Sequence, residues 1–358
     1  MGFWAMRLSH NVSYFMPNAI KIISLSLFIA FNFLFTGPAN AETELEQRHS
    51  ISMATKKSFL AEDFAQLEKV SALYRTTKNR TSSGLWLLTL FYGGINAAIA
   101  EVEKQAHNDA DVDAPYRLLE AKTKRWAEQF PDSPTAHVTH SMVLIRHGWA
   151  YRGEGYASTV KPESWAPFFR YIAMAREHLE KYKAVAAIDP RWYEIMLLVA
   201  KAENWERGEF DRLLDEALGQ EPLFYQTYFS ALEYLLPKWH GSLAEIEAFA
   251  QDAVKRTLNQ EGRGMYARIY WYASQTQFEN DIFKDSFAVW PSMKAGFDDV
   301  VSDYPDAWNY NNYAKFACLA GDQPKTRELL KRIKSSIVPT AWNPPAFINY
   351  CKKWAAQK

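Results

Sequence analysis

Apolar residues recur every three or four positions over almost the whole chain after Ser58, as in Phe59, Phe64 and Leu67. That spacing is the period of a helix with one buried face, and no stretch shows the two-residue alternation of a half-buried strand. The sequence therefore predicts an all-α protein. Further runs with the helical spacing span residues 85–104, 116–129, 135–151, 165–187, 191–205, 210–218, 223–236, 243–258, 265–274, 292–302, 308–320, 324–333 and 346–356.

Proline marks the ends of several of these runs. An acidic or polar residue stands beside a proline at residues 130–134, 188–190, 220–222 and 302–305, and a helical run follows each time. Proline suits the first turn of a helix because its missing N–H has no partner there. Together with a glycine-containing joint at residues 262–264, most of these joints lie about 32 to 43 residues apart, close to the period of helical-hairpin repeats.

One longer interval contains residues 152–167, which are rich in glycine, serine and proline and are interpreted as an insertion. We expect a flexible segment over residues 42–57 and a single helical-repeat domain over residues 58–356. The predicted architecture is an α-solenoid of tetratricopeptide-like antiparallel helical hairpins, each burying its apolar face against its neighbours. The alternative is an irregular helical domain in which the regular spacing is a coincidence.

The start of the chain has a different composition, because residues 1–41 contain no aspartate or glutamate. Lys21 precedes an almost entirely apolar core over residues 22–35, which is shorter than the about 20 residues that cross a bilayer. Residues 39–41, Ala-Asn-Ala, supply the small side chains of a signal-peptidase site. We expect residues 1–41 to be a cleaved signal peptide, which gives a periplasmic or secreted protein without stable membrane insertion. The alternative is an uncleaved anchor.

The charge balance and the cysteines restrict the partners further. The chain carries 41 basic and 41 acidic side chains, so no net field recruits nucleic acid or an anionic membrane surface. Its only cysteines are Cys318 and Cys351. An even number of cysteines in a chain bound for an oxidising compartment favours a disulfide. Two reduced, buried thiols are the alternative, because sequence spacing does not establish geometry.

Two short stretches carry the candidate binding residues. HGWAYRGEG places Trp149 and Arg152 at the mouth of the insertion, where an arginine can hold a carboxylate or stack on a ring. In LLPKWHGSLAEIE, a proline stop, a glycine and a Ser-x-x-Glu capping box mark a helix boundary, which leaves Trp239 and His240 unexplained. We expect these four residues to bind a partner. The alternative is structural: an arginine tying the insertion to the repeats and an indole filling a gap between hairpins.

Three histidines form the sharpest metal candidate. His137, His140 and His147 share one face of a predicted helix. The rise of the helix, however, places His147 about 10 Å from His140, which is too far for one ion. We therefore expect structural or exposed histidines and no metal.

An acidic run has the spacing of a calcium-binding loop. Asp109, Asp111 and Asp113, followed by Glu120, match the ligand positions of such a loop. Ala114, however, stands where the loop needs glycine for its sharp turn. A solvated acidic loop is the favoured interpretation, so we expect no cofactor.

Familiar catalytic motifs are absent, including the nucleophile elbow, the zinc-protease helix, the phosphate-binding loop and the Cys-x-x-Cys pair. A catalytic alternative is a helical toroid acting on envelope glycans, which needs two carboxyl groups about 5 to 9.5 Å apart. The aromatic residues at 268–271 and 308–311 could line its groove, although such spacing is also typical of a core. The conceivable acids are Glu154, Glu194, Asp298 and Asp299.

Four stretches resemble a bacterial family of exported, tetratricopeptide-like proteins known only as a domain of unknown function. They are GWAYRG at 148–153, LLPKWHGS at 235–242, YARIYW at 266–271 and WNYNNYAKFACLAGD at 308–322. With the chain between them they cover most of the expected domain. The resemblance implies a helical-hairpin fold and no activity, since the family has no established catalytic residues to carry over. His240 stands where the family pattern leads us to expect glycine.

Export, repeats and missing catalytic motifs together predict a non-catalytic protein of the cell envelope. We expect its concave surface to bind a protein or peptide partner. A glycan-binding or glycan-active protein of the envelope is the alternative.

Overall fold

The computed structural model describes residues 42–105, 111–153, 155 and 157–357, and within them it contains helices and no β-strand. The predicted all-α class is therefore confirmed. The α-helices are α1 (Glu44–Leu60), α2 (Phe64–Thr77), α3 (Leu87–Gln105), α4 (Asp113–Gln129), α5 (Pro134–Arg152), α6 (Trp165–Lys181), α7 (Lys183–Ala186), α8 (Pro190–Ala202), α9 (Arg207–Gln220), α10 (Tyr225–Leu235), α11 (Leu243–Glu261), α12 (Gly264–Ala273), α13 (Ile282–Asp285), α14 (Trp290–Asp303), α15 (Ala307–Leu319), α16 (Gln323–Arg332) and α17 (Phe347–Ala356). Single turns occur at η1 (Ala157–Thr159), η2 (Pro162–Ser164), η3 (Ser274–Phe278), η4 (Glu279–Asp281) and η5 (Pro339–Ala341).

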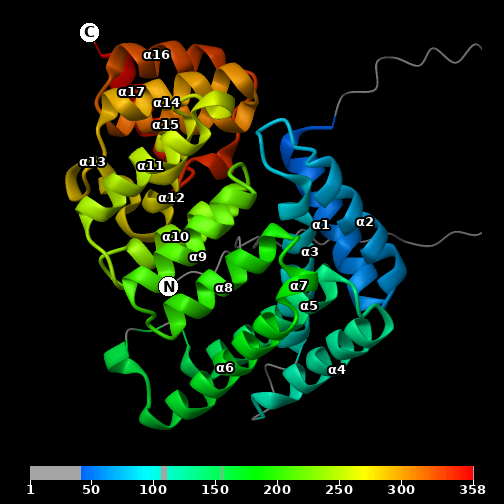
Figure 1. Cartoon of the computed structure of the whole chain (residues 1–358). Helices are drawn as coiled ribbons and strands as arrows, with labels where there is room; N and C mark the ends of the chain where they lie inside the picture. Colours follow the sequence, from blue (N-terminus) through cyan, green and yellow to red (C-terminus); the bar gives the residue numbers. More distant parts are fainter. Residues whose placement is uncertain (1–41, 106–110, 154, 156, 358) are drawn as a thin grey trace, which may run out of the picture.

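Almost wholly buried helices alternate along the chain with helices that expose one face. Helices α5, α8, α10, α12 and α15 bury most of their residues, whereas α4, α6, α9, α11, α14 and α16 bury only a stripe. Each helix packs mainly against helices one or two places away in the chain, as Figure 1 shows. This two-layer packing is consistent with the expected helical-repeat domain.

Two of the predicted proline joints begin helices as expected. Pro134 and Pro190 are the first residues of α5 and α8. Ser133 Oγ accepts a hydrogen bond from the N–H of Ala136 at 2.9 Å, and Asp189 accepts one from the N–H of Arg191 at 2.9 Å. Each joint therefore combines a side-chain cap with a proline that needs no donor.

The expectation of a flexible segment over residues 42–57 is wrong, because these residues lie in and just before α1. Thr43 and Glu46 form a complete capping box at its start. The helix has few apolar residues, and its approach to α3 depends on Gly94, where an added Cβ would lie 2.4 Å from the Ser52 carbonyl oxygen. The apolar pattern of α1 is weak because the close backbone contact at Gly94 provides part of the packing between α1 and α3.

The predicted insertion forms the connection between α5 and α6, and it contains η1 and η2. The two helices still pack along each other. Gly148 permits their approach, since a Cβ at that position would lie 3.1 Å from the Phe168 carbonyl oxygen. The insertion therefore leaves the hairpin intact. Glu154 lies outside the described residues.

The loop between α2 and α3, residues 78–86, runs past the starts of several later helices (Figure 1). Lys78 forms an ion pair with Glu221 at 2.6 Å, just before α10. Arg80 donates to the Tyr225 hydroxyl at 2.6 Å and pairs with Glu261 at 3.2 Å. The loop thereby connects the N-terminal helices to α10 and the end of α11.

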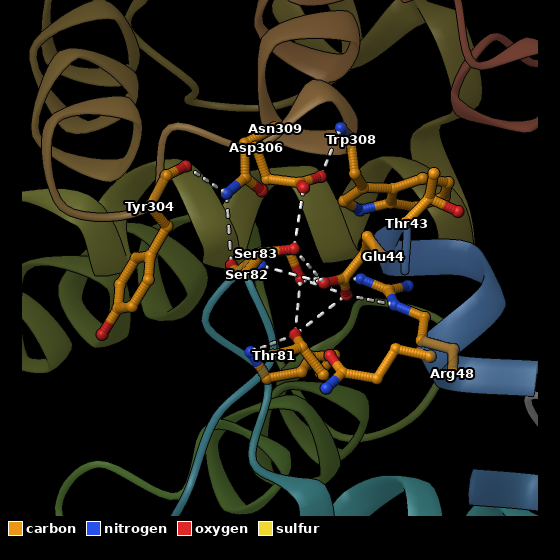
Figure 2. Close-up of polar contacts among 12 residues, drawn as sticks. Thr43, Glu44, Arg48, Thr81, Ser82, Ser83, Tyr304, Asp306, Trp308 and Asn309 are labelled. Atoms are coloured by element: carbon orange, nitrogen blue, oxygen red, sulfur yellow. Dashed lines mark hydrogen bonds and ion pairs between the residues drawn. The ribbon is translucent and has the colours of Figure 1, made fainter. Parts of the chain in front are cut away.

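The same loop continues to the C-terminal helices, where α1 joins it (Figure 2). The Ser83 carbonyl oxygen accepts from Arg268 of α12 at 3.3 Å and from Asn309 of α15 at 3.2 Å. Arg48 of α1 donates to Ser83 Oγ at 2.9 Å and lies 4.8 Å from the Trp308 ring centroid. Residues far apart in the sequence are therefore fastened together at one place.

Glu44 is the centre of this junction and is buried. It accepts hydrogen bonds from Thr81, Ser82 and the Ser83 N–H at 2.9, 2.9 and 3.0 Å. Burial alone would raise the pKa of Glu44, but the charge of Arg48 and the hydrogen bonds from Ser83 hold it below its usual value. The carboxylate is therefore ionised and fully used within the junction.

Cys318 and Cys351 form a disulfide that joins α15 to α17. The two cysteines are 33 residues apart in sequence. Closing a loop of that size stabilises the folded state by about 4 kcal/mol, chiefly by restricting the unfolded chain.

The predicted signal peptide, residues 1–41, lies outside the described residues. Among the helices that are described, none combines the length and the apolar character needed to cross a membrane.

Candidate functional site

The four candidate binding residues, Trp149, Arg152, Trp239 and His240, line one pocket of about 310 Å³. They come from two places, the end of α5 and the connection between α10 and α11. Trp165, the first residue of α6, completes the pocket's aromatic wall. The structure therefore brings together two stretches that the sequence separates by about ninety residues.

Close backbone packing after α10 fixes the position of Trp239. The Trp239 N–H donates to the Leu236 carbonyl at 2.8 Å, and the His240 N–H donates to the Tyr234 carbonyl at 3.2 Å. A Cβ on Gly241 would lie 1.9 Å from the Leu235 carbonyl oxygen. We expected this glycine to mark a helix boundary; in addition, only glycine fits this close approach.

The predicted start of the next helix is present as well. Ser242 is the N-cap of α11 and accepts a hydrogen bond from the Glu245 N–H at 3.3 Å. Its hydroxyl donates to the Glu245 carboxylate at 2.8 Å. Two secured helix ends therefore hold the segment that carries the indole and the imidazole.

Three tryptophans surround the Arg152 guanidinium. Its central carbon lies 4.9 Å from the Trp149 ring centroid, 5.3 Å from that of Trp165 and 5.7 Å from that of Trp239. Lys201 of α8 reaches two of these rings, with its Nζ atom 5.9 Å from the Trp149 centroid and 5.0 Å from the Trp239 centroid. The pocket therefore already uses its aromatic faces to hold two cations of the chain itself.

Only one of the pocket's cations has a carboxylate partner among the described residues. Lys201 forms an ion pair with Glu233. Arg152 donates to the Gly153 and Gly155 carbonyls at 3.1 and 3.0 Å, and Lys238 donates to the Thr276 carbonyl at 2.6 Å. No aspartate or glutamate of the described residues lines the pocket. The part of the lining that the structure describes therefore carries an excess of positive charge.

The pKa shifts follow from this arrangement. Burial lowers the pKa of Arg152, whose guanidinium nevertheless stays charged. Burial also lowers the pKa of Lys238. Burial alone would raise the pKa of Glu233, but the charge of Lys201 and hydrogen bonds from Lys201 and Tyr272 hold it below its usual value. Glu233 is therefore ionised and offsets one positive charge.

His240 lies at the exposed rim of the pocket. Its Nε2 atom is 3.3 Å from the Lys201 carbonyl oxygen, and its ring centroid is 4.7 Å from that of Tyr234. These contacts leave the imidazole accessible to a partner.

The sequence did not single out three residues of the pocket: Trp165, Lys201 and Lys238. Trp165 follows the insertion directly and could have been identified from that position. Lys201 lies in a helical run with no local sign of function. It reaches the pocket only because α8 packs on α5 and α6, and no sequence period encodes that contact.

The histidines separate into two groups instead of forming a metal site. His137 Nδ1 lies 3.2 Å from the Nε2 atom of His178 in α6, and the rings of His140 and His178 are 4.7 Å apart. Burial lowers the pKa of His140 to about 4 and that of His178 to about 3. In the parts of the chain that the structure describes, no three His, Cys, Asp or Glu side chains are placed to hold a metal ion.

The acidic run supplies partners for the remaining histidine. His147 bonds to Asp113 through Nε2 at 2.7 Å and to Glu120 through Nδ1 at 2.6 Å. Asp113 and Glu120 are residues of α4, and Asp111 pairs with Arg117. We expected this acidic run to be a solvated loop. Its described part instead leads into α4, and its carboxylates pair with His147 and Arg117. Asp109 lies outside the described residues.

The other acids proposed for a glycan-active site have separate partners. Glu194 is buried and pairs with Arg191, and burial raises its pKa. Asp299 pairs with Arg263 at 2.9 Å. Asp298 accepts from a tyrosine hydroxyl at 2.6 Å. None of these three residues lines the pocket.

The aromatic stretches at 268–271 and 308–311 belong mainly to the core. Tyr270, Trp271 and Trp308 are all buried, and the two indole centroids lie 6.2 Å apart. These three rings are therefore part of the packed core.

No protein-family model, no curated protein and no solved structure matches the chain. The resemblance to the exported tetratricopeptide-like family therefore remains an expectation based on the four stretches quoted above.

Proposed function

We propose that this chain is an exported helical-repeat protein that binds a protein or peptide partner of the cell envelope. The pocket formed by Trp149, Arg152, Trp239 and His240 is the proposed anchoring point. This proposal includes the signal peptide, the periplasmic or secreted location and the tetratricopeptide-like repeat architecture.

The observation that carries the proposal is the convergence of these residues on one small pocket. Tryptophan and arginine in a well-packed pocket are the residue types that dominate binding energy at protein interfaces. The volume of about 310 Å³ is at the lower end of the range for ligand pockets, which suits one anchored side chain or chain end.

The position of the α2–α3 loop also affects where a partner binds. We expected the concave surface to be the binding surface, but residues 78–86 occupy polar groups of Tyr225 in α10, Arg268 in α12 and Asn309 in α15. Within the described chain these groups already have partners. The pocket at the end of α5 is therefore the better candidate.

A glycan-active enzyme is less well supported. Glu194, Asp298 and Asp299 are engaged with other side chains. Hydrolysis of a glycosidic bond needs an acid pair at the substrate, whereas the described lining of the pocket is cationic.

Affinity capture after crosslinking in cells tests the proposal. The tagged protein is compared with a Trp149→Ala, Arg152→Ala double variant that is shown to be folded. An Arg332→Met variant serves as control, because Arg332 also stacks on a ring, 4.1 Å from the Tyr310 centroid, but outside the pocket. We expect one stoichiometric partner that the double variant loses and the control retains. Equal capture by all three proteins would contradict the proposal.

A further inference from the structure

Charge and donors in the pocket indicate what kind of group enters it. Arg152, Lys201 and Lys238 line it, and among the described carboxylates only Glu233 pairs with any of them. An arginine has five N–H donors and a lysine three, so the two bonds of Arg152 and the one bond each of Lys201 and Lys238 leave donors unused. The Trp239 indole N–H is buried and also lacks a hydrogen-bond partner. The unmet demand is therefore for acceptors.

Two ligand classes fit this demand poorly. A cation would meet rings that already hold Arg152 and Lys201, and it would be repelled by both. A neutral apolar ligand would cover the buried guanidinium without giving it an acceptor, which is costly.

A carboxylate joined to an apolar group fits the demand well. The flat guanidinium fork binds a planar carboxylate with two parallel hydrogen bonds, while the parts of the aromatic rings that line the pocket beside Arg152 and Lys201, including Phe168, pack against the attached apolar group. The last residue of a peptide carries a main-chain carboxylate and an apolar side chain on the same carbon, so one residue supplies both. A glutamate or aspartate side chain provides the charge without the apolar group.

We infer that the pocket captures the free C-terminal carboxylate of a peptide or protein that ends in an apolar or aromatic residue. This inference rests on the proposed function, because it names the part of the partner that enters the pocket. The caged Arg152 binds the carboxylate, Lys238 adds charge, and Trp149, Trp165 and Trp239 hold the side chain.

Three acetylated tripeptides test the inference on the full chain by ligand-observed NMR titration. The first has two alanines and a final phenylalanine with a free carboxylate. The second has the same sequence with a carboxamide end. The third also ends in a carboxamide but has glutamate as its middle residue, so its only carboxylate is on a side chain. Charge-assisted hydrogen bonds predict that the first peptide binds about tenfold more tightly, or better, than either of the others.

Variants then assign the effect to the pocket. Arg152→Met keeps the unbranched stem and removes the charge, and it should lower the affinity of the free acid to that of the amide. Arg332→Met should leave the preference intact, because Arg332 lies outside the pocket. If Arg152→Met fails to fold, Lys238→Met is used instead, with a smaller loss of preference expected. The comparison of acid with amide needs no variant.

Several results would overturn the inference: equal affinity of acid and amide, equally tight binding of the glutamate peptide, or no binding of any peptide. If cellular capture still depended on Trp149 and Arg152, the proposed function would stand and only the C-terminal carboxylate would be rejected. If capture failed and the free acid bound selectively, the carboxylate site would stand without the envelope partner.

Discussion

At the scale of single residues, the buried charges of Glu44 and Arg152 have different kinds of partners. Glu44 receives hydrogen bonds from three successive residues of the α2–α3 loop and the charge of Arg48. Arg152, by contrast, has main-chain carbonyls and aromatic faces as its described partners. A fully satisfied buried charge holds structure together, whereas a cation short of acceptors is prepared for a ligand. This contrast separates the structural junction from the proposed binding pocket.

Glu44→Gln should destabilise the protein by about 2–4 kcal/mol, because it removes a charge that Arg48 and several donors require. Urea unfolding measures the change. Glu46→Gln is the matched control, since that carboxylate is exposed and serves only the helix cap; we expect little change there. Similar stabilities for the two variants would mean that Glu44 does not secure the junction.

The histidine cluster should make stability depend on pH. Burial keeps the folded pKa values of His140 and His178 at about 4 and about 3, so between pH 6.5 and pH 4 the unfolded chain binds protons that the folded chain does not. Stability should therefore fall as the pH is lowered through this window, by about 2–3 kcal/mol for His140 alone. The charge of Glu120 favours protonation of His140, but burial outweighs it, and Lys124 near His140 and Lys181 near His178 also disfavour protonation.

Urea unfolding at several pH values compares the wild type with His178→Gln, which removes one of these sites. Carboxylates that titrate near pH 4 affect both proteins alike, so the difference in slope reports the histidine. A variant with the same slope as the wild type would show that the cluster does not control acid stability.

At the scale of elements, periodicity predicted the helices that bury an apolar stripe, and α5, α8 and α15 begin within one residue of the expected positions. It missed α1, where a capping box and the close approach at Gly94 replace a broad apolar face. It also gave no role to residues 78–84 and placed Leu85 and Trp86, which precede α3, in the predicted helix. Several of the loop's partners, such as Tyr225 and Asn309, lie more than a hundred residues away, and a local pattern carries no information about such contacts.

Gly84→Ala tests how strongly the α2–α3 loop is held. Gly84 has φ +94°, and a Cβ there would lie 3.0 Å from the Arg268 guanidinium and the Tyr304 ring. We expect a loss of about 1–3 kcal/mol in urea unfolding and faster amide exchange in residues 78–86. Gly219→Ala in α9 is the control: a Cβ there meets open space, so stability should stay equal or rise by up to about 1 kcal/mol. Equal results for the two variants would show that the loop is only loosely attached.

At the scale of the whole molecule, the sequence predicted the helical class and singled out four candidate binding residues. It did not predict that these four residues line one pocket. Trp149 and Trp239 stand with their rings perpendicular and their centroids 6.2 Å apart, because α8, α5 and α6 pack together. The same packing brings Lys201 to the pocket from a run without local signals. Residue types and helix ends are encoded locally, whereas the charge of the pocket depends on how the hairpins stack.

Partner binding at this pocket is the central claim, and site-specific photo-crosslinking in cells tests it most directly. A photoreactive residue replaces His240 at the exposed rim in one protein, and in another it replaces Arg212 of α9, whose side chain is 79% exposed. We expect a single adduct from position 240 that is absent from position 212 and disappears when Arg152 is changed to methionine. No adduct from position 240, or the same adduct from both positions, would contradict the claim.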